Sequence, residues 1–254
     1  MIRTKTWQYF DNFMKTNKMR SVIILLLAIS WVVVGTAQEV TSPKTSVLDA
    51  KQIDVRDSTG KQMKFEEWSR LVVSGKYELK VNQAGNGGTL QKVSDSLYKK
   101  KMMSMPYPGE SSSFVTGTVP ESFTTRTIAG KKVDLGRLKG KVVVLNFWFV
   151  NCPPCRQEIP ELNLLTREFA NKEVVFLGIA LDDQAQLEEF IKGIPFDYQL
   201  IASGSSIASQ YGVRAYPTHA VLGKDGKVVF QTKGLGPTTL FWLKESIEKA
   251  LVTP

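Results

Sequence analysis

The chain has 254 residues, 43% of them hydrophobic, which is enough to bury the core of one sizeable domain together with smaller segments. Its formal net charge is +9, but the basic residues are distributed along the chain, with one short cluster at 99–101. Without a basic stripe, a nucleic-acid partner is not expected. We interpret the cluster as solvated surface rather than as a phosphate or anionic-lipid contact.

Residues 1–37 have the pattern of a signal peptide. Basic residues precede the apolar stretch Ser21–Val34, and small residues follow it up to Ala37. Because this stretch is shorter than the roughly 20 residues that cross a bilayer, we expect export and cleavage after Ala37. An uncleaved membrane tether through residues 21–35 is the alternative. The predicted location is the periplasm or the outer face of the cytoplasmic membrane.

Residues 38–113 are predicted to form a small β-rich segment followed by a linker. Apolar residues alternate with polar ones at 53–55 and again at 77–81, which is typical of short strands. The Gly-rich stretch "NQAGNGG" at 82–88 and then "PYPGESSS" at 106–113 indicate a linker, with a domain boundary near Ser113. The pattern assigns no function to this segment.

Residues 114–254 alternate between strand and helix patterns. The expected elements are a hairpin at 123–133, a buried central strand at 141–150, a helix at 158–170, a second buried strand at 173–181, a helix at 184–192, two strands around the turn 224–226, and a final helix at 238–252. This order predicts an α/β domain in which a mixed sheet has helices on both faces.

The two cysteines of the chain, Cys152 and Cys155, form a CPPC motif directly after the central strand. A structural zinc site uses four ligands, and two Cys with a single His make a metal site an unfavoured interpretation. A disulfide that closes so short a loop adds little stability, so a purely structural bridge is also disfavoured. In an exported protein, reversible thiol–disulfide chemistry is the favoured interpretation. No cofactor besides this redox-active disulfide is expected.

The motif predicts different roles for the two cysteines. Pro153 suits the first turn of a helix, which places Cys152 at the helix N-terminus, where free N–H groups and the helix dipole favour a thiolate. Cys152 is therefore the expected nucleophile. Cys155 lies about one turn later, facing inward, and is expected to attack the mixed disulfide and release the partner. Pro153 and Pro154 stiffen the motif and are predicted to border the substrate.

The sequence around the motif resembles the thioredoxin superfamily. The resemblance rests on "FWFVNCPPC" at a strand-to-helix junction and on Tyr216-Pro217-Thr218 before a later strand. The run "VPESFTTRTIAGKKVDLGRLKGKVVVLNFWFVNCPPCRQEIPELNLL" is similar, more narrowly, to the exported TlpA/ResA-type thiol-disulfide oxidoreductases, some of which serve cytochrome c maturation. The resemblance covers about residues 115–254 and implies a thioredoxin-like fold.

The resemblance also implies roles for residues outside the motif. Pro217 would be a cis-proline facing the disulfide, which leaves the backbone of Tyr216 free to pair with an extended client. Trp148 would shield the site and contact substrate, with core packing as the alternative. Glu158 would be a carboxylate that tunes the thiols and accepts a proton from the resolving one. The alternative interpretation is that Glu158 is an ordinary glutamate on the helix surface.

Three further positions bear on the site. Asn146 stands where cytoplasmic thioredoxins carry a buried aspartate, so a substitute proton acceptor such as Glu158 becomes more plausible. Asn151 replaces the common Trp before the first cysteine, which alters the rim that partners touch. His219, the one histidine, is interpreted as an ordinary strand residue rather than as a thiol-linked one.

The predicted function is an exported thiol-disulfide oxidoreductase that reduces protein disulfides, with protein clients and an upstream, membrane-bound electron donor as partners. A peroxiredoxin-type peroxidase is disfavoured, because Phe149 stands where that class needs Thr or Ser and Leu145 where it needs Pro. The other alternative is a non-enzymatic chaperone for copper or for haem apoproteins, in which His219 and methionines would complete the site.

Overall fold

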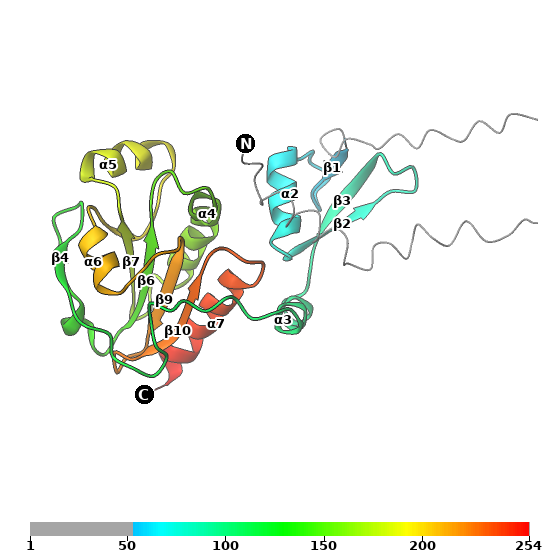
Figure 1. Ribbon diagram of the computed structural model, residues 1–254. Coiled ribbons are helices and arrows are strands. Elements are labelled where there is room, and N and C mark those ends of the chain that lie inside the picture. The colour runs from blue at the N-terminus through cyan, green and yellow to red at the C-terminus, as the bar shows by residue number, and fades with distance from the viewer. Residues whose placement is uncertain (1–52, 254) are drawn as a thin grey trace, which may run out of the picture. The chain divides into compact units, whose positions relative to one another are not determined.

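The computed structural model describes residues 53–253 (Figure 1). The predicted signal peptide, its cleavage site and the tether at 21–35 lie outside the described residues. Within 53–253 no helix has the length and apolarity needed to cross a membrane.

The N-terminal part of the described chain is a small α+β unit. It contains β1 (Asp54–Arg56), α2 (Phe65–Val73), β2 (Tyr77–Val81), β3 (Gly87–Lys92) and α3 (Asp95–Ser104). The strands form a three-stranded sheet in the order β1-β3-β2, with Val55, Trp68 and Leu90 buried in its small core. The two predicted strands are present as β1 and β2. The strand β3 and the helices α2 and α3 were not predicted. The spacing of Phe65, Trp68 and Leu71 carried a helical signal for α2.

A second, larger sheet organises the rest of the chain. Its strands are β6 (Val142–Trp148), β7 (Val174–Ala180), β8 (Gln199–Ile201), β9 (Thr218–Leu222) and β10 (Val228–Lys233). They lie in the order β10-β9-β6-β7-β8. β6, β7 and β8 are parallel, whereas β9 and β10 are antiparallel to their neighbours. The predicted mixed sheet is thus confirmed, with β6 fully buried at its centre.

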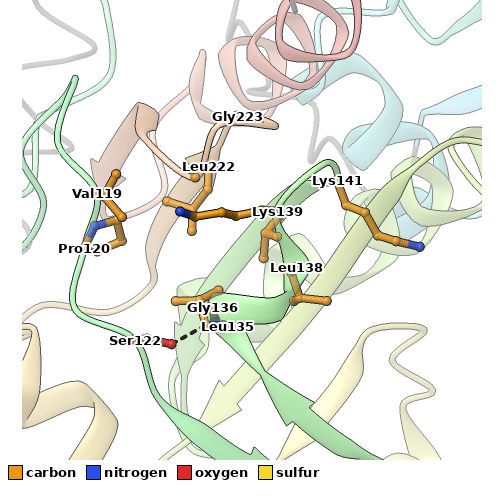
Figure 2. Close-up of a pocket in the computed structure, with 12 residues that line it drawn as sticks. Val119, Pro120, Ser122, Leu135, Gly136, Leu138, Lys139, Lys141, Leu222 and Gly223 are labelled. Carbon is orange, nitrogen blue, oxygen red and sulfur yellow. Dashed lines mark hydrogen bonds between the residues drawn. The ribbon is translucent and has the colours of Figure 1, made fainter.

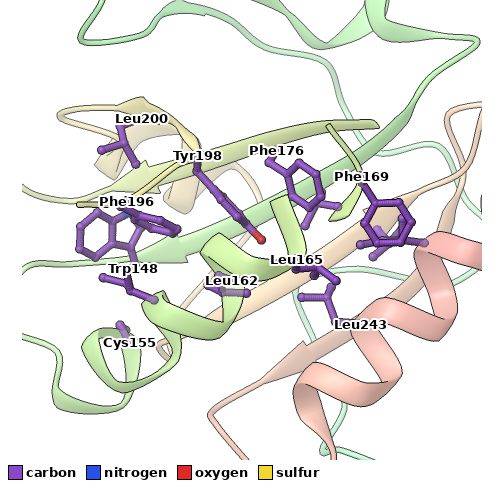
Figure 3. Close-up of a cluster of buried hydrophobic side chains, with 14 of the residues drawn as sticks. Trp148, Cys155, Leu162, Leu165, Phe169, Phe176, Phe196, Tyr198, Leu200 and Leu243 are labelled. Atoms are coloured by element: carbon purple, nitrogen blue, oxygen red, sulfur yellow. The ribbon is translucent and has the colours of Figure 1, made fainter. Parts of the chain in front are cut away.

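Two hydrophobic clusters cover the two faces of this sheet. The remaining elements are β4 (Thr124–Arg126), β5 (Lys132–Asp134), the 3-10 helix η3 (Leu135–Leu138), α4 (Pro153–Glu168), α5 (Gln184–Gly193), α6 (Ser205–Gln210) and α7 (Thr239–Val252). Side chains of α4, α5 and α7 join Val144 and Trp148 of β6 in one cluster (Figure 3). Those of α6 and the β4–β5 hairpin join Leu145 and Phe147 in the other. This alternation along β6 confirms the predicted α/β class.

Both edges of the larger sheet are covered by other backbone. At one edge, Gly117 N donates to Val228 O and Lys233 N donates to Gly109 O, so the predicted linker follows β10 closely. At the other, Ile128 N in the β4–β5 turn donates to Leu200 O of β8. Covered edges leave fewer free N–H and C=O groups for pairing with other chains.

A glycine on β7 makes room for the aromatic side of the core. A Cβ at Gly178 would lie 2.8 Å from Leu200 Cδ2 and 3.4 Å from Trp148 Nε1. We expect Gly178→Ala to lower the free energy of unfolding by about 1–3 kcal/mol, because the added methyl overfills a packed interior. Urea denaturation measures this. Gly193→Ala is the matched control, since a Cβ there meets nothing within 4 Å, and equal stability of the two variants would contradict the packing argument.

Candidate active site

The site is built where β6 ends and α4 begins. Cys152 is the N-cap of α4, with Pro153 and Pro154 in the first two helical positions. Cys152 and Cys155 are joined in a disulfide with Cα atoms 5.3 Å apart. Cys155 N lies 3.3 Å from Cys152 Sγ, so a backbone donor of the first helical turn points at the predicted nucleophile. The predicted placement of both cysteines is confirmed.

The loop that presents the cysteines is fixed by an acidic residue that sequence reasoning did not single out. Val150 N donates to Asp182 Oδ2 at 2.7 Å, and Leu181 N donates to Trp148 O at 3.1 Å. Asp182 follows β7, the parallel neighbour of β6. The carboxyl ends of parallel strands meet at one edge of a sheet, so a polar residue directly after each buried strand was the available signal.

The rim of the site is partly apolar. Phe149 and Tyr216 meet edge to face with ring centroids 5.4 Å apart, and both pack against the cluster that contains the disulfide. The Tyr216–Pro217 peptide bond is cis, as the resemblance implied, and burial raises the pKa of the Tyr216 hydroxyl. Pro153 is exposed, Pro154 is half-buried and Cys152 is only 2% exposed. A client must therefore reach Cys152 over this rim.

Trp148 lies behind the site rather than on it. The side chain is fully buried and packs against Phe190 and Phe196, with ring centroids 5.5 and 5.3 Å away. Figure 3 shows it beside Phe196, close to Cys155 at the start of α4. The prediction that Trp148 contacts substrate is wrong for this form, because the ring offers no surface. Core packing, the alternative, is what the structure shows.

A buried polar network lies on the same face of the sheet as the disulfide. Glu158 of α4 is 1% exposed, which excludes its interpretation as a surface glutamate. Asn146 Nδ2 lies 3.1 Å from Glu158 Oε1, and His219 Nε2 lies 3.0 Å from Oε2. Asn146 and His219 are register partners on β6 and β9, so the sheet itself places them side by side. His219 is a strand residue as interpreted, but its ring belongs to this network, which the sequence did not predict.

Further polar atoms surround the network. Tyr198 is buried, and its pKa is raised well above the usual value, first by burial and then by the negative charge of Glu158. Its hydroxyl, Trp148 Nε1 and Asn146 Oδ1 are buried atoms without a hydrogen-bond partner among the described side chains. The carboxylate therefore lies in a region that is enclosed but not uniformly apolar.

Two further observations concern the described residues away from the disulfide. Within it, no group of three or more His, Cys, Asp and Glu side chains could hold a metal ion. A small pocket (Figure 2) lies between η3, the start of β6 and the β9–β10 turn, with the side chains of Lys139 and Lys141 near it. Its lining includes neither cysteine, and Gly136 N donates to Ser122 Oγ across it at 2.8 Å. The pocket is thus separate from the redox site.

Comparison with known proteins agrees with this geometry. Residues 115–231 match the AhpC/TSA family. The thiol-disulfide oxidoreductase ResA of Bacillus thuringiensis subsp. konkukian (strain 97-27) is 34% identical over 140 residues, which cover 54% of this chain and 79% of the relative. Thioredoxin-like protein YneN of Bacillus subtilis (strain 168) is 33% identical over 138 residues, covering 53% and 78%.

Solved structures show the same fold. A Chlorobium tepidum protein described as a thiol:disulfide interchange protein DsbE superposes with a TM-score of 0.51 at 27% identity, covering 54% of this chain and 99% of that one. Given the relatives' identity and coverage, this chain belongs to the ResA-like thiol-disulfide oxidoreductases, which carry a thioredoxin fold.

Proposed function

We propose that this oxidoreductase acts as a reductase of protein disulfides, with Cys152 as nucleophile and Cys155 as resolving residue. One observation carries the assignment of roles: Cys152 is the N-cap of α4, and its sulfur accepts from Cys155 N. Backbone donors and the helix dipole at that end stabilise a thiolate. Cys152 and Cys155 are 2% and 1% exposed, so the N-cap position rather than burial distinguishes the nucleophile from the resolving residue.

The cycle balances over two exchanges. The Cys152 thiolate attacks one sulfur of the client disulfide, a Cys152–client bond forms, and the other client sulfur leaves as a thiolate that takes a proton. Cys155 then loses its proton and attacks Cys152, the Cys152–client bond breaks, and the second client thiolate is released and protonated. Two electrons pass to the client. A dithiol donor must return them by reducing the Cys152–Cys155 disulfide.

We assign client binding to the apolar rim around Phe149 and Tyr216 and to the unpaired backbone of Tyr216. Pairing between β6 and β9 ends at Phe147 and Thr218, so Tyr216 lies just beyond the last paired residue. Its N–H and C=O make no backbone hydrogen bond among the described residues. An extended client segment could pair there by strand addition, while Pro153, Pro154 and the Tyr216 ring contact its side chains.

The protein is proposed to work outside the cytoplasm, in the periplasm or at the outer face of the cytoplasmic membrane. The signal-peptide pattern of residues 1–37 supports this location. Because that compartment oxidises thiols, the proposal includes a membrane-bound donor that keeps the pair reduced. The resemblance to ResA-type proteins makes the disulfide of a cytochrome c apoprotein a candidate client.

The reduction potential of the Cys152/Cys155 couple tests the direction of electron flow. We expect a value near or below about −270 mV, in the range of thioredoxin, measured by equilibration with dithiothreitol and glutathione buffers. A value near about −120 mV would instead identify a disulfide donor. Rapid consumption of hydrogen peroxide by the reduced protein would favour the peroxidase alternative over both.

A further inference from the structure

Side chains from two strands contact the Glu158 carboxylate. On β6, Asn146 Nδ2 donates to Oε1; on β9, His219 Nε2 lies 3.0 Å from Oε2. Tyr198 faces it from the segment before β8, and Cys155 precedes it by one turn on α4. Among the described residues, no Lys or Arg makes an ion pair with Glu158, and the imidazole of His219 is the basic side chain in contact with it.

The Asn146 amide contacts the His219 ring without singling out one ring nitrogen. Asn146 Nδ2 lies 3.2 Å from Nδ1 and 3.4 Å from Nε2, distances too nearly equal for an in-plane bond to either nitrogen. The ring instead meets Glu158 through Nε2, which lies 3.0 Å from Oε2. The contact that ties His219 to the carboxylate is therefore the one through Nε2.

Hydrogen bonds from Asn146 and His219 stabilise the buried Glu158 carboxylate. Burial disfavours the charged form of a carboxyl group, and hydrogen bonds to the charged form restore it. Asn146 serves one oxygen only, so the other depends on His219. A side chain at 219 without a donor at that position would leave one oxygen of the buried carboxylate without this partner, and the Glu158 side chain would no longer be held in place.

Glu158 is a helical neighbour of Cys155, the proposed resolving thiol. Side chains three residues apart on a helix are neighbours, with Cβ atoms about 5–6 Å apart. Cys155 and Glu158 have this spacing on α4, and both are buried at 1% exposure. Since bulk water has little access to Cys155, the proton that it loses before attack needs an acceptor within the protein.

We propose that His219 is a positioning residue of the thiol–disulfide reaction: its Nε2–H donates to the Glu158 carboxylate and holds it one helical turn from Cys155. The inference rests on the proposed roles of the two cysteines. In the resolving step, the proton moves from Cys155 Sγ to the Glu158 carboxylate, the Cys155 sulfur bonds to Cys152, and the Cys152–client bond breaks to release the client thiolate. His219 acts only by holding the carboxylate.

Two amide variants provide a matched test. In His219→Gln, the amide nitrogen reaches the position of Nε2 and can still donate to Glu158. In His219→Asn, the shorter side chain reaches only the position of Nδ1, beside Asn146. Both variants place a neutral amide at the same buried strand position, so they differ mainly in the donor that the proposal requires.

The readout is the reaction of the reduced protein with one equivalent of the aromatic disulfide dithiobis(nitrobenzoate). Attack by Cys152 releases a first coloured thiolate, and attack by Cys155 on the mixed disulfide releases the second. We expect His219→Asn to slow the second phase by at least about 10-fold at neutral pH. The first phase should stay within about twofold, and His219→Gln should retain most of the second-phase rate.

Four results separate the possible failures. An unchanged second phase in His219→Asn, or equal losses in both amide variants, overturns the role of His219. Equal slowing of both phases in His219→Asn points to a general structural effect and also overturns it. If the wild-type protein itself releases no second thiolate, the proposed roles of Cys152 and Cys155 fail instead.

Discussion

Replacing Cys152 with Ser is expected to reduce disulfide reductase activity by at least about 1,000-fold while leaving the fold intact. A hydroxyl is not ionised at neutral pH, so the variant has no nucleophile for a client disulfide. The fold should survive for a local reason: Ser is a favoured N-cap, and its oxygen can accept from Cys155 N as the sulfur does now. Insulin reduction with a dithiol donor measures the loss.

Cys155→Ser is the matched partner of this experiment. With Cys152 free and no resolving thiol, the variant should stay joined to its client, visible as an adduct that dithiothreitol cleaves. Both variants should unfold close to the wild-type midpoint, because the short disulfide loop contributes little stability. Adducts on Cys155 in the Cys152→Ser protein would reverse the assigned roles.

The fold could be predicted from the sequence wherever an element is long and its pattern strong. The apolar run of β6 and the Pro153 start of α4 identified the central strand and the helix that carries the disulfide. β8 and α6 span only three and six residues, too few for a period to emerge. The N-terminal helices were missed because the few alternating residues nearby favoured strands.

The polar network of Asn146, Glu158 and His219 could not be predicted from the pattern of residues close together in the sequence. Glu158 could be picked out through its spacing from Cys155, but His219 is 61 residues from it and 73 from Asn146. Their contact depends on the register of β9 against β6, which pairs Asn146 with His219. A shift of one residue would turn the ring to the opposite face of the sheet. A single histidine in an apolar strand carries no sign of such a partner.

Glu158→Gln is expected to slow the resolving phase by about 100-fold at neutral pH, within the range typical of a lost general base. The substitution keeps size and shape but removes the proton acceptor. It also sets an amide against the donors of Asn146 and His219, and one donor left unsatisfied costs about 1–3 kcal/mol of stability. The exposed Glu168→Gln on the same helix is the control, and both phases should remain unchanged in it.

The pH dependence of the resolving phase distinguishes the loss of a proton acceptor in Glu158→Gln from a loss of stability. In Glu158→Gln no carboxylate is available to take the proton, so the resolving rate should rise steeply with pH until the Cys155 thiol ionises unaided. The wild-type protein, with its acceptor in place, should show a weaker rise over the same range. A variant that is merely distorted would be slower at every pH with the wild-type profile retained. Such a parallel loss would show that the buried carboxylate supports the fold and does not take the proton of Cys155.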